Sequence, residues 1–262
     1  MKKILILTMS CNKPYFKTLL GAVRNTWAKP LIQNKYPNIT WFSYTTCDEK
    51  HPNPYVDFEE HMIYVKCGDT LGDTMQKTID AYNMVKHIDQ FDYVVRTNTS
   101  VYVNIENMLN RIELMYNMNE PTVCGTFSRI KTSDNEVFWM AIGYFFITNH
   151  EVFDIMTSKN DYVDSNNDYN MDDVLMFKNL YHVLGNDWGD ITINESGEIP
   201  WYKGIKDGRE IPIDYQITNM KLTRDPNVVN DNVLVRLRPE YKEKREEMCE
   251  VQHFYELHDA LI

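Results

Sequence analysis

The sequence predicts an α/β fold with a mostly parallel central sheet. Three observations support this: a buried-type apolar run opens the chain, β-branched and aromatic strand patterns follow it, and segments of helical spacing alternate with them over about the first two-thirds of the sequence. The chain has 262 residues, 43% hydrophobic and 25% charged, which is an ordinary globular composition. We therefore expect one large domain, or one domain with a long appendage.

The chain opens as strand, loop and helix. Residues 4–9 form an apolar run of strand length, and Pro14 suits the first turn of a helix. Apolar residues from Phe16 to Trp27 then recur at helical spacing, so Trp27 is expected in the core. Further strands are expected at 39–46, 61–67, 91–97, 122–127 and 138–148, and further helices at 75–88, 105–116, 148–156 (begun by a Thr148/Glu151 capping box) and 172–184.

The pattern loosens after Gly185. Short strand-like pieces such as 233–237 precede a last amphipathic helix over 251–262. We expect an α/β core over 1–185, and an irregular α+β extension over 186–262 that completes the same domain.

Charge and cysteine content restrict the partners and the compartment. The net charge of -11 opposes binding to a phosphate backbone, so nucleic acid is not the expected partner. Five scattered cysteines without a C-x-x-C pair indicate a reducing compartment. The apolar start is too short for a signal peptide, and no later stretch reaches the roughly 20 residues that cross a bilayer. A cytoplasmic protein, bacterial or in a virus-infected host, is expected.

Polar residues follow the predicted strands at their carboxyl ends, where open α/β sheets bind ligands. They include Ser10, Asp48, Asp69 and the segment 96–100. Neither G-x-G-x-x-G after the first strand nor a G-x-x-x-x-G-K-[ST] loop is present. These patterns indicate an α/β domain that binds a polar small molecule, and they indicate no more than that.

Five segments in order carry a resemblance to a known family: Arg24-Asn25-Thr26-Trp27, Asp73 to Thr78, Tyr93 to Asn104, Gly143-Tyr144 and Met171-Asp172-Asp173-Val174. They resemble the R-x-T-W, D-x-Y-x-N-L-x-x-K-T, Y-v-x-K-x-D-D-D-v-F-V-N, G-x-x-Y and E-D-V elements of the β1,3-galactosyltransferase and Fringe-like glycosyltransferases. The resemblance spans Arg24 to Val174 and is weak in the last third of the chain.

This resemblance implies a GT-A-like three-layer α/β/α sandwich and an inverting transfer from a nucleoside diphosphate sugar to a glycan hydroxyl. It also implies that the core over 1–185 binds the nucleotide sugar and that the extension over 186–262 completes the acceptor side. The family holds a divalent cation with its D-D-D acids, where this chain has the neutral Asn98, Thr99 and Ser100. Leu234 also stands near where many relatives carry a metal-binding histidine. We therefore expect no metal ligands and no tightly bound cofactor, although a weakly held Mn²⁺ or Mg²⁺ could accompany the donor diphosphate.

The resemblance also assigns site residues. Asp173 is the expected general base, ahead of Asp172, although both could simply be first-turn acids that favour the helix dipole. Expected donor-binding residues are Ser10, Arg24, Asp48, Lys77, Arg96, Asn98, Thr99, Ser100, Arg236 and Arg238, and expected acceptor-binding residues are Trp139, Gly143 and Tyr144.

Several of these residues have a simpler interpretation. Lys77 could be an exposed helix residue, Arg24 could form a surface salt bridge, and residues 98–100 could be a plain strand-to-turn connection.

Two other functions are compatible with the sequence. A catalytically silent domain of the same fold would only bind nucleotide or glycan, and the missing acids motivate this reading. A retaining transferase or nucleotidyltransferase on a similar sheet has less motif support. The acid pair at 172–173 favours activity, since a binding domain needs no base there.

Overall fold

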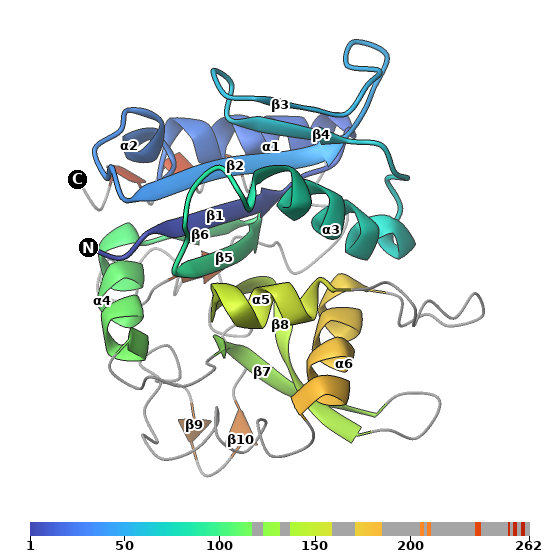
Figure 1. Ribbon diagram of the computed structural model, residues 1–262. Helices are drawn as coiled ribbons and strands as arrows, with labels where there is room; N and C mark the ends of the chain where they lie inside the picture. Colours follow the sequence, from blue (N-terminus) through green and yellow to red (C-terminus); the bar gives the residue numbers. More distant parts are fainter. Residues whose placement is uncertain are drawn as a thin grey trace. The chain divides into compact units, whose positions relative to one another are not determined.

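A seven-stranded sheet forms the centre of the computed structural model, in the order β3-β4-β2-β1-β5-β8-β7 (Figure 1). The structure describes residues 1–116, 123–131, 137–158, 171–184, 205–206, 209–210, 234–236, 251, 254–255 and 258–259. Its strands are β1 (Ile4–Met9), β2 (Ile39–Thr46), β3 (Tyr55–Asp57), β4 (Met62–Val65), β5 (Tyr93–Asn98), β7 (Val123–Lys131) and β8 (Val137–Asn149).

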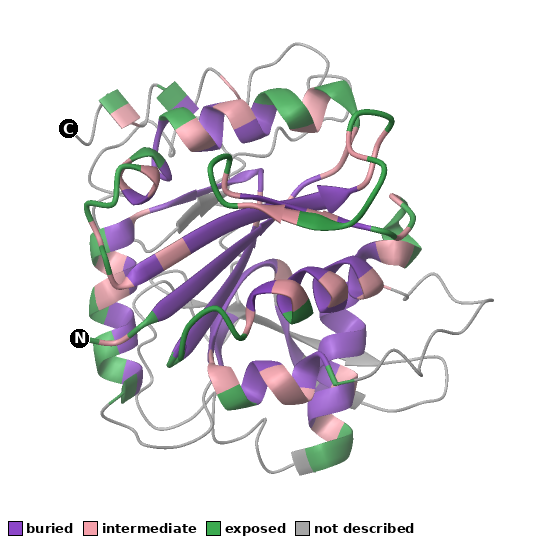
Figure 2. Ribbon diagram, turned by 45° about the horizontal axis from the view of Figure 1, so that its top comes forward, coloured by how far each residue is buried: buried purple, intermediate pink, exposed green. Residues whose placement is uncertain are grey.

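The sheet is parallel near its centre and antiparallel at both edges. β1 pairs in parallel with β2, and β2 with β4, whereas β3, β8 and β7 join through antiparallel pairs. The first five residues of β1 are fully buried, because strands lie on both sides of it and both of its faces are covered. This explains why β1 has a continuous apolar run instead of an alternating pattern, and Figure 2 shows the same burial along the neighbouring strands.

Three helices pack with this sheet in the same compact unit: α3 (Thr74–Val85), α5 (His150–Met156) and α6 (Asp172–Leu184). α3 packs on β2 and β4, α6 packs on β8, and α6 also contacts both α3 and α5. The short 3-10 helix η1 (Leu71–Asp73) leads into α3, and the Thr70 and Asp73 side chains cap it reciprocally. This unit comprises residues 1–12, 38–97 and 120–195, and we call it the sheet unit.

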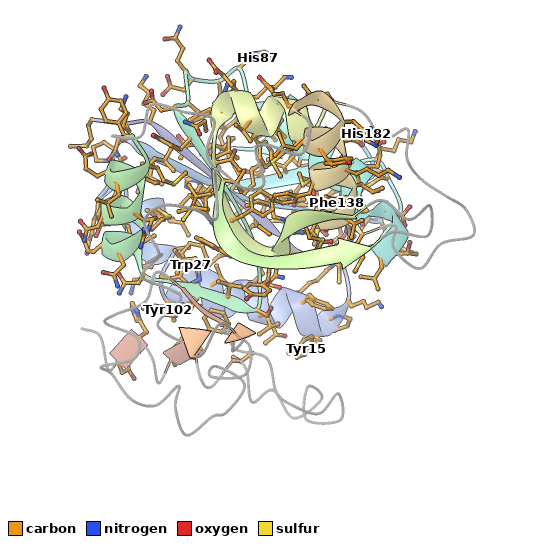
Figure 3. All side chains as sticks on the ribbon, turned by 90° about the horizontal axis from the view of Figure 1, so that it is seen from below. Tyr15, Trp27, His87, Tyr102, Phe138 and His182 are labelled. Atoms are coloured by element: carbon orange, nitrogen blue, oxygen red, sulfur yellow. The ribbon has the colours of Figure 1, made fainter. Side chains whose placement is uncertain are left out.

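The second compact unit comprises residues 13–37, 98–119 and 196–262. It contains α1 (Pro14–Asn25), α2 (Lys29–Ile32), β6 (Val101–Val103), α4 (Ile105–Tyr116), β9 (Ile205–Lys206), β10 (Arg209–Glu210) and β11 (Leu234–Arg236). Trp27 is buried here, and its indole N–H donates to the Val101 carbonyl at 3.0 Å; Figure 3 labels it with Tyr102. The expected core position of Trp27 is confirmed.

The predicted α/β class with a largely parallel central sheet is confirmed. The structure reproduces the expected bounds of β1, β2, α4 and α6. Through residue 116, the predicted strands and helices also occur in the expected order along the chain. The three-residue strands β3 and β6 were not predicted, because so short a segment has no period to detect.

The predicted Thr148/Glu151 capping box is wrong. Asn149 is the N-cap of α5 and makes no side-chain capping bond, and the Thr148 hydroxyl donates to the Asn149 carbonyl instead. The division into 1–185 and 186–262 stays a prediction, since most of the second part lies outside the described residues. Among those described, no helix is long and apolar enough to cross a membrane.

Candidate active site

Polar side chains of the sheet unit gather at the carboxyl ends of β1, β2 and β4. Asn12 connects them, because its side-chain amide donates to the Thr46 carbonyl at 2.8 Å and its backbone N–H donates to Asp69 Oδ2 at 2.8 Å. Ser10 is buried, and its backbone N–H donates to the Tyr44 carbonyl at the end of β2. The predicted clustering of polar groups at this edge is therefore present in the structure.

Lys77 is buried in this cluster. Its side chain is 2% exposed, forms an ion pair with Asp69, and directs Nζ at the Ser10 carbonyl at 3.4 Å. The alternative that Lys77 is an exposed helix residue is wrong. Its ammonium charge is neutralised by Asp69, which also accepts the Asn12 N–H.

Helix α3 contributes two further contacts from the same face. Thr78 Oγ1 lies 2.9 Å from the Tyr44 hydroxyl, and Thr74 Oγ1 accepts the backbone N–H of Asp172 at 3.2 Å. Residues 74, 77 and 78 point in similar directions because they are three or four apart on a helix. α3 thus links the strand ends to the first turn of α6.

Arg96 on β5 forms the second buried ion pair. Its Nη2 donates to Asp172 Oδ2 and lies 3.6 Å from Met9 Sδ, and the residue is only 1% exposed. Its Nε and Nη1 have no hydrogen-bond partner among the described residues. Arg96 is therefore a buried cation beside the acid pair, and it is not presented at the surface as the predicted diphosphate ligand would be.

Asp173 is held by the backbone of β8. Its Oδ2 accepts the Gly143 N–H at 2.8 Å, and its Oδ1 accepts the Val174 N–H at 2.9 Å. A Cβ at position 143 would lie 2.8 Å from both Cβ and Oδ2 of Asp173, so only glycine allows this approach. Gly143 was predicted on the acceptor side; in the structure it contacts the predicted base.

The electrostatics separate Asp173 from an ordinary surface acid. Burial raises its pKa to about 6, with the neighbouring Asp172 charge acting in the same direction and the Gly143 N–H and Arg96 opposing it. Burial alone would lower the pKa of Arg96, but the neighbouring acids, Asp172 before Asp173, raise it. Burial also raises the pKa of Tyr44 to about 12, so its hydroxyl stays neutral. The carboxyl group of Asp173 can therefore exchange a proton near neutral pH.

Asp48 is engaged in a local turn. Its Oδ1 accepts the backbone N–H groups of Lys50 at 3.1 Å and His51 at 3.0 Å, and it also lies 3.0 Å from His51 Nδ1. A carboxylate that organises its own turn in this way has a structural role already. Its predicted donor-binding role stays a prediction.

Residues 98–100, which stand where the resembled family has its acids, form hydrogen bonds with one another. Asn98 Oδ1 accepts both the backbone N–H of Ser100 at 3.0 Å and its hydroxyl at 2.8 Å, and Thr99 is buried. These bonds agree with the alternative of a strand-to-turn connection. The predicted donor-binding role of residues 98–100 stays a prediction. Neutral oxygens engaged in a turn are poor ligands for a hard divalent cation, and no group of three His, Cys, Asp or Glu suited to a metal occurs in the described residues.

Other predicted donor residues belong to the second unit. Arg24 is half-buried in the last turn of α1. The backbone of Arg236 in β11 pairs with Val101 of β6, directly after the 98–100 segment, so these two predicted regions are adjacent within that unit. Tyr144, predicted on the acceptor side, is buried within β8. Arg238 and the side chains of Trp139 and Arg236 lie outside what the structure describes.

Four residues described above were not predicted as site residues: Asn12, Tyr44, Thr74 and Thr78. The ion pair of Asp69 was not predicted either. Asp69 was predicted only as a polar residue at a strand end. Helical spacing could have indicated that Thr74 and Lys77 are buried. Thr74, Thr78, Ala81 and Val85 recur three or four residues apart on one buried face of α3, and Lys77, three residues after Thr74, is buried too.

Comparison with known proteins assigns no family. No protein-family model and no curated protein matches the sequence. Among solved structures, 4-diphosphocytidyl-2C-methyl-D-erythritol synthase from Anaerococcus prevotii is similar with a TM-score of 0.41 and 12% identity over 71% of this chain and 84% of that one. The 2-C-methyl-D-erythritol 4-phosphate cytidylyltransferase of Francisella tularensis is similar with a TM-score of 0.32 and 15% identity over 56% and 72%. Both similarities are low, and neither assigns an activity to this chain.

Proposed function

We propose that this protein is an inverting glycosyltransferase that moves a sugar from a nucleoside diphosphate sugar to a glycan hydroxyl. The observation that carries the proposal is the buried acid pair at the start of α6, in which Asp173 has its pKa raised to about 6. Inverting transfer needs a carboxylate that can accept a proton near neutral pH. The motif resemblance supports the same residue as the base.

In this mechanism Asp173 accepts the proton of the acceptor hydroxyl as the acceptor oxygen attacks the anomeric carbon. The bond between that carbon and the diphosphate breaks, and the nucleoside diphosphate leaves with the electron pair. Gly143 positions Asp173 through its backbone N–H. Asp172, paired with Arg96, supplies a neighbouring negative charge that favours proton uptake by Asp173.

The reaction is proposed to need no tightly held metal, because the residues that match the family's acids are neutral. EDTA should therefore leave donor affinity within about twofold, whereas high salt should weaken the binding of a diphosphate held by Lys and Arg side chains. Isothermal titration of nucleoside diphosphates with and without Mn²⁺ measures this directly. A strict Mn²⁺ requirement would show that the metal-free mechanism is wrong.

A screen of nucleotide sugars with candidate glycan acceptors tests the activity itself. The expected products are a nucleoside diphosphate and an elongated glycan with inverted anomeric configuration. Release of inorganic pyrophosphate from a nucleoside triphosphate would instead identify a nucleotidyltransferase. Tight binding of nucleotide or glycan without any product would identify a silent binding domain, which is the second candidate because the metal-binding acids of the family are missing.

A further inference from the structure

The position of Arg96 suggests a role other than donor binding. The residue is 1% exposed, its Nη2 donates to Asp172 Oδ2, and Asp172 is adjacent in sequence to Asp173. Because this guanidinium is 1% exposed, a diphosphate cannot reach it without a rearrangement of the structure, and a diphosphate that displaced Asp172 would leave a buried carboxylate without its partner. The arrangement fits a counter-ion for the acid pair better than it fits a phosphate ligand.

The two carboxylates have different partners although they are neighbours in sequence. The Asp172 carboxylate pairs with the Arg96 guanidinium on β5, and the Asp172 backbone N–H donates to Thr74 Oγ1 of α3. Within the described part of the chain, the bonds that Asp173 accepts come from neutral backbone N–H groups, those of Gly143 in β8 and of Val174. When a cation pairs with one of two neighbouring carboxylates, the other carboxylate is the one that mainly takes up and releases the proton.

We infer that Arg96 is a positioning residue that fixes Asp172 as its ion-pair partner and thereby assigns the proton transfer of this site to Asp173. This deepens the proposed function, since it concerns the same carboxylates. The charged and titratable groups that act on the pair are Arg96 from β5 and Tyr44 from β2, and the polar groups that bond it are Thr74 from α3 and the Gly143 N–H from β8. Of these four groups, only the Arg96 guanidinium carries a positive charge, and the Tyr44 hydroxyl, whose pKa is raised to about 12, adds no negative charge near neutral pH.

Two substitutions should change the titration of Asp173 in opposite directions. Arg96→Met removes the cation and leaves two adjacent buried carboxylates, so the Asp173 midpoint should rise by about 1–3 pH units. Asp172→Asn removes the like charge and leaves Arg96 free to attract Asp173, so the midpoint should fall. Arg96→Lys keeps the charge but loses the planar guanidinium, and should give a smaller rise than Arg96→Met.

The titration is followed by ¹³C NMR of carboxyl-labelled aspartate in the full chain, with the Asp173 signal assigned by its loss in Asp173→Asn. Folding of each variant is checked by circular dichroism. If Arg96→Met does not fold, the Asp173 midpoints of Arg96→Lys and Asp172→Asn still test the inference. An Asp173 midpoint that stays constant in these folded variants would overturn the inference.

Nucleotide affinity provides the second measurement. If Arg96 positions the acids, Arg96→Lys should change the dissociation constant of the nucleoside diphosphate by no more than about twofold. A loss of tenfold or more would show that Arg96 is a donor ligand. The NMR result does not depend on turnover, so opposite midpoint shifts without any sugar transfer would uphold the role of Arg96 while rejecting the glycosyltransferase proposal.

Discussion

Lys77 and Arg96 are both buried cations that pair with a carboxylate of the sheet unit, but the two clusters differ in charge balance. Among the residues that the structure describes, Lys77 has one acid partner, Asp69, and a second acceptor in the Ser10 carbonyl. Arg96 lies beside two adjacent acids and keeps two nitrogen atoms without a hydrogen-bond partner among the described residues. The first cluster is neutral overall and joins strand ends, whereas the second carries an excess negative charge. The comparison shows that burial of an ion pair does not itself indicate chemistry: what distinguishes the unbalanced cluster is a second buried acid, Asp173, whose pKa is raised.

Removing the proposed base should have the largest effect. Asp173→Asn keeps nearly the same shape but cannot accept a proton, so the rate of sugar transfer should fall by about 10² to 10⁴-fold. Donor affinity should stay nearly constant. Asp154→Asn, an exposed acid on α5, is the matched control and should keep full activity. If a folded Asp173→Asn remained fully active, the base would have to be another residue.

Breaking the balanced pair should lower stability, with no direct effect on proton transfer. Lys77→Met leaves Asp69 without its cation, and the free energy of unfolding should fall by about 3 kcal/mol. Lys86→Met breaks a more exposed pair with Asp154 and should cost about 0–1 kcal/mol. Urea denaturation of both variants tests the contrast. Equal losses would mean that burial of the Lys77 pair does not determine its importance.

The raised pKa of Asp173 also predicts how stability depends on pH. In the folded state this carboxyl ionises only near pH 6, whereas its reference value is 3.8. Its stabilising contribution is thus complete below about pH 4 and is lost as pH rises through about 6, by on the order of 2–3 kcal/mol. Unfolding free energies at several pH values should show this fall in the wild type. The fall should be absent in Asp173→Asn, and a parallel pH dependence in that variant would contradict the prediction.

The close approach of Gly143 to Asp173 gives the last predicted effect on stability. Gly143→Ala places a methyl group 2.8 Å from the Asp173 carboxylate and should cost about 1–3 kcal/mol while displacing the base. Gly21→Ala is the matched control: nothing lies within 4 Å of its Cβ position inside α1, so this change should stabilise by about 0.5–1 kcal/mol. Thermal melts and transfer rates of both variants measure the difference. Similar melting temperatures and transfer rates of the two variants would contradict the prediction, because they would mean that the backbone of β8 shifts to accommodate the methyl group.

The sequence predicted elements well where local pattern decides structure. The apolar run of β1 and the amphipathic stripe of α4 gave the bounds that the structure has, because burial on both faces or on one face leaves a clear period. The start of α5 was predicted from a residue pair, and the Thr148 hydroxyl turned to a nearby carbonyl instead. Short edge strands such as β3 had no such pattern.

The site was predictable only in part. The acid pair and the polar strand ends could be located from motif resemblance and from the edge rule for parallel sheets. The pairing of Arg96 with Asp172 joins residues 76 positions apart, and that of Lys77 with Asp69 depends on which face of α3 meets the sheet. Such partners follow from tertiary packing, so residue type alone suggested free cations for both.

Helix α3 connects the two clusters through Thr74, Lys77 and Thr78, and this has a consequence for local unfolding. If α3 separated from the sheet, Asp172 would lose a backbone contact, Asp69 would lose its cation and Tyr44 would lose its hydroxyl partner in the same event. Amide protons of α3 and of the first turn of α6 should therefore exchange with solvent as one cooperative group, with similar opening free energies. The acid pair and the polar groups at the strand ends would then be ordered together while α3 is packed on the sheet, and both would lose their positions in the same opening event.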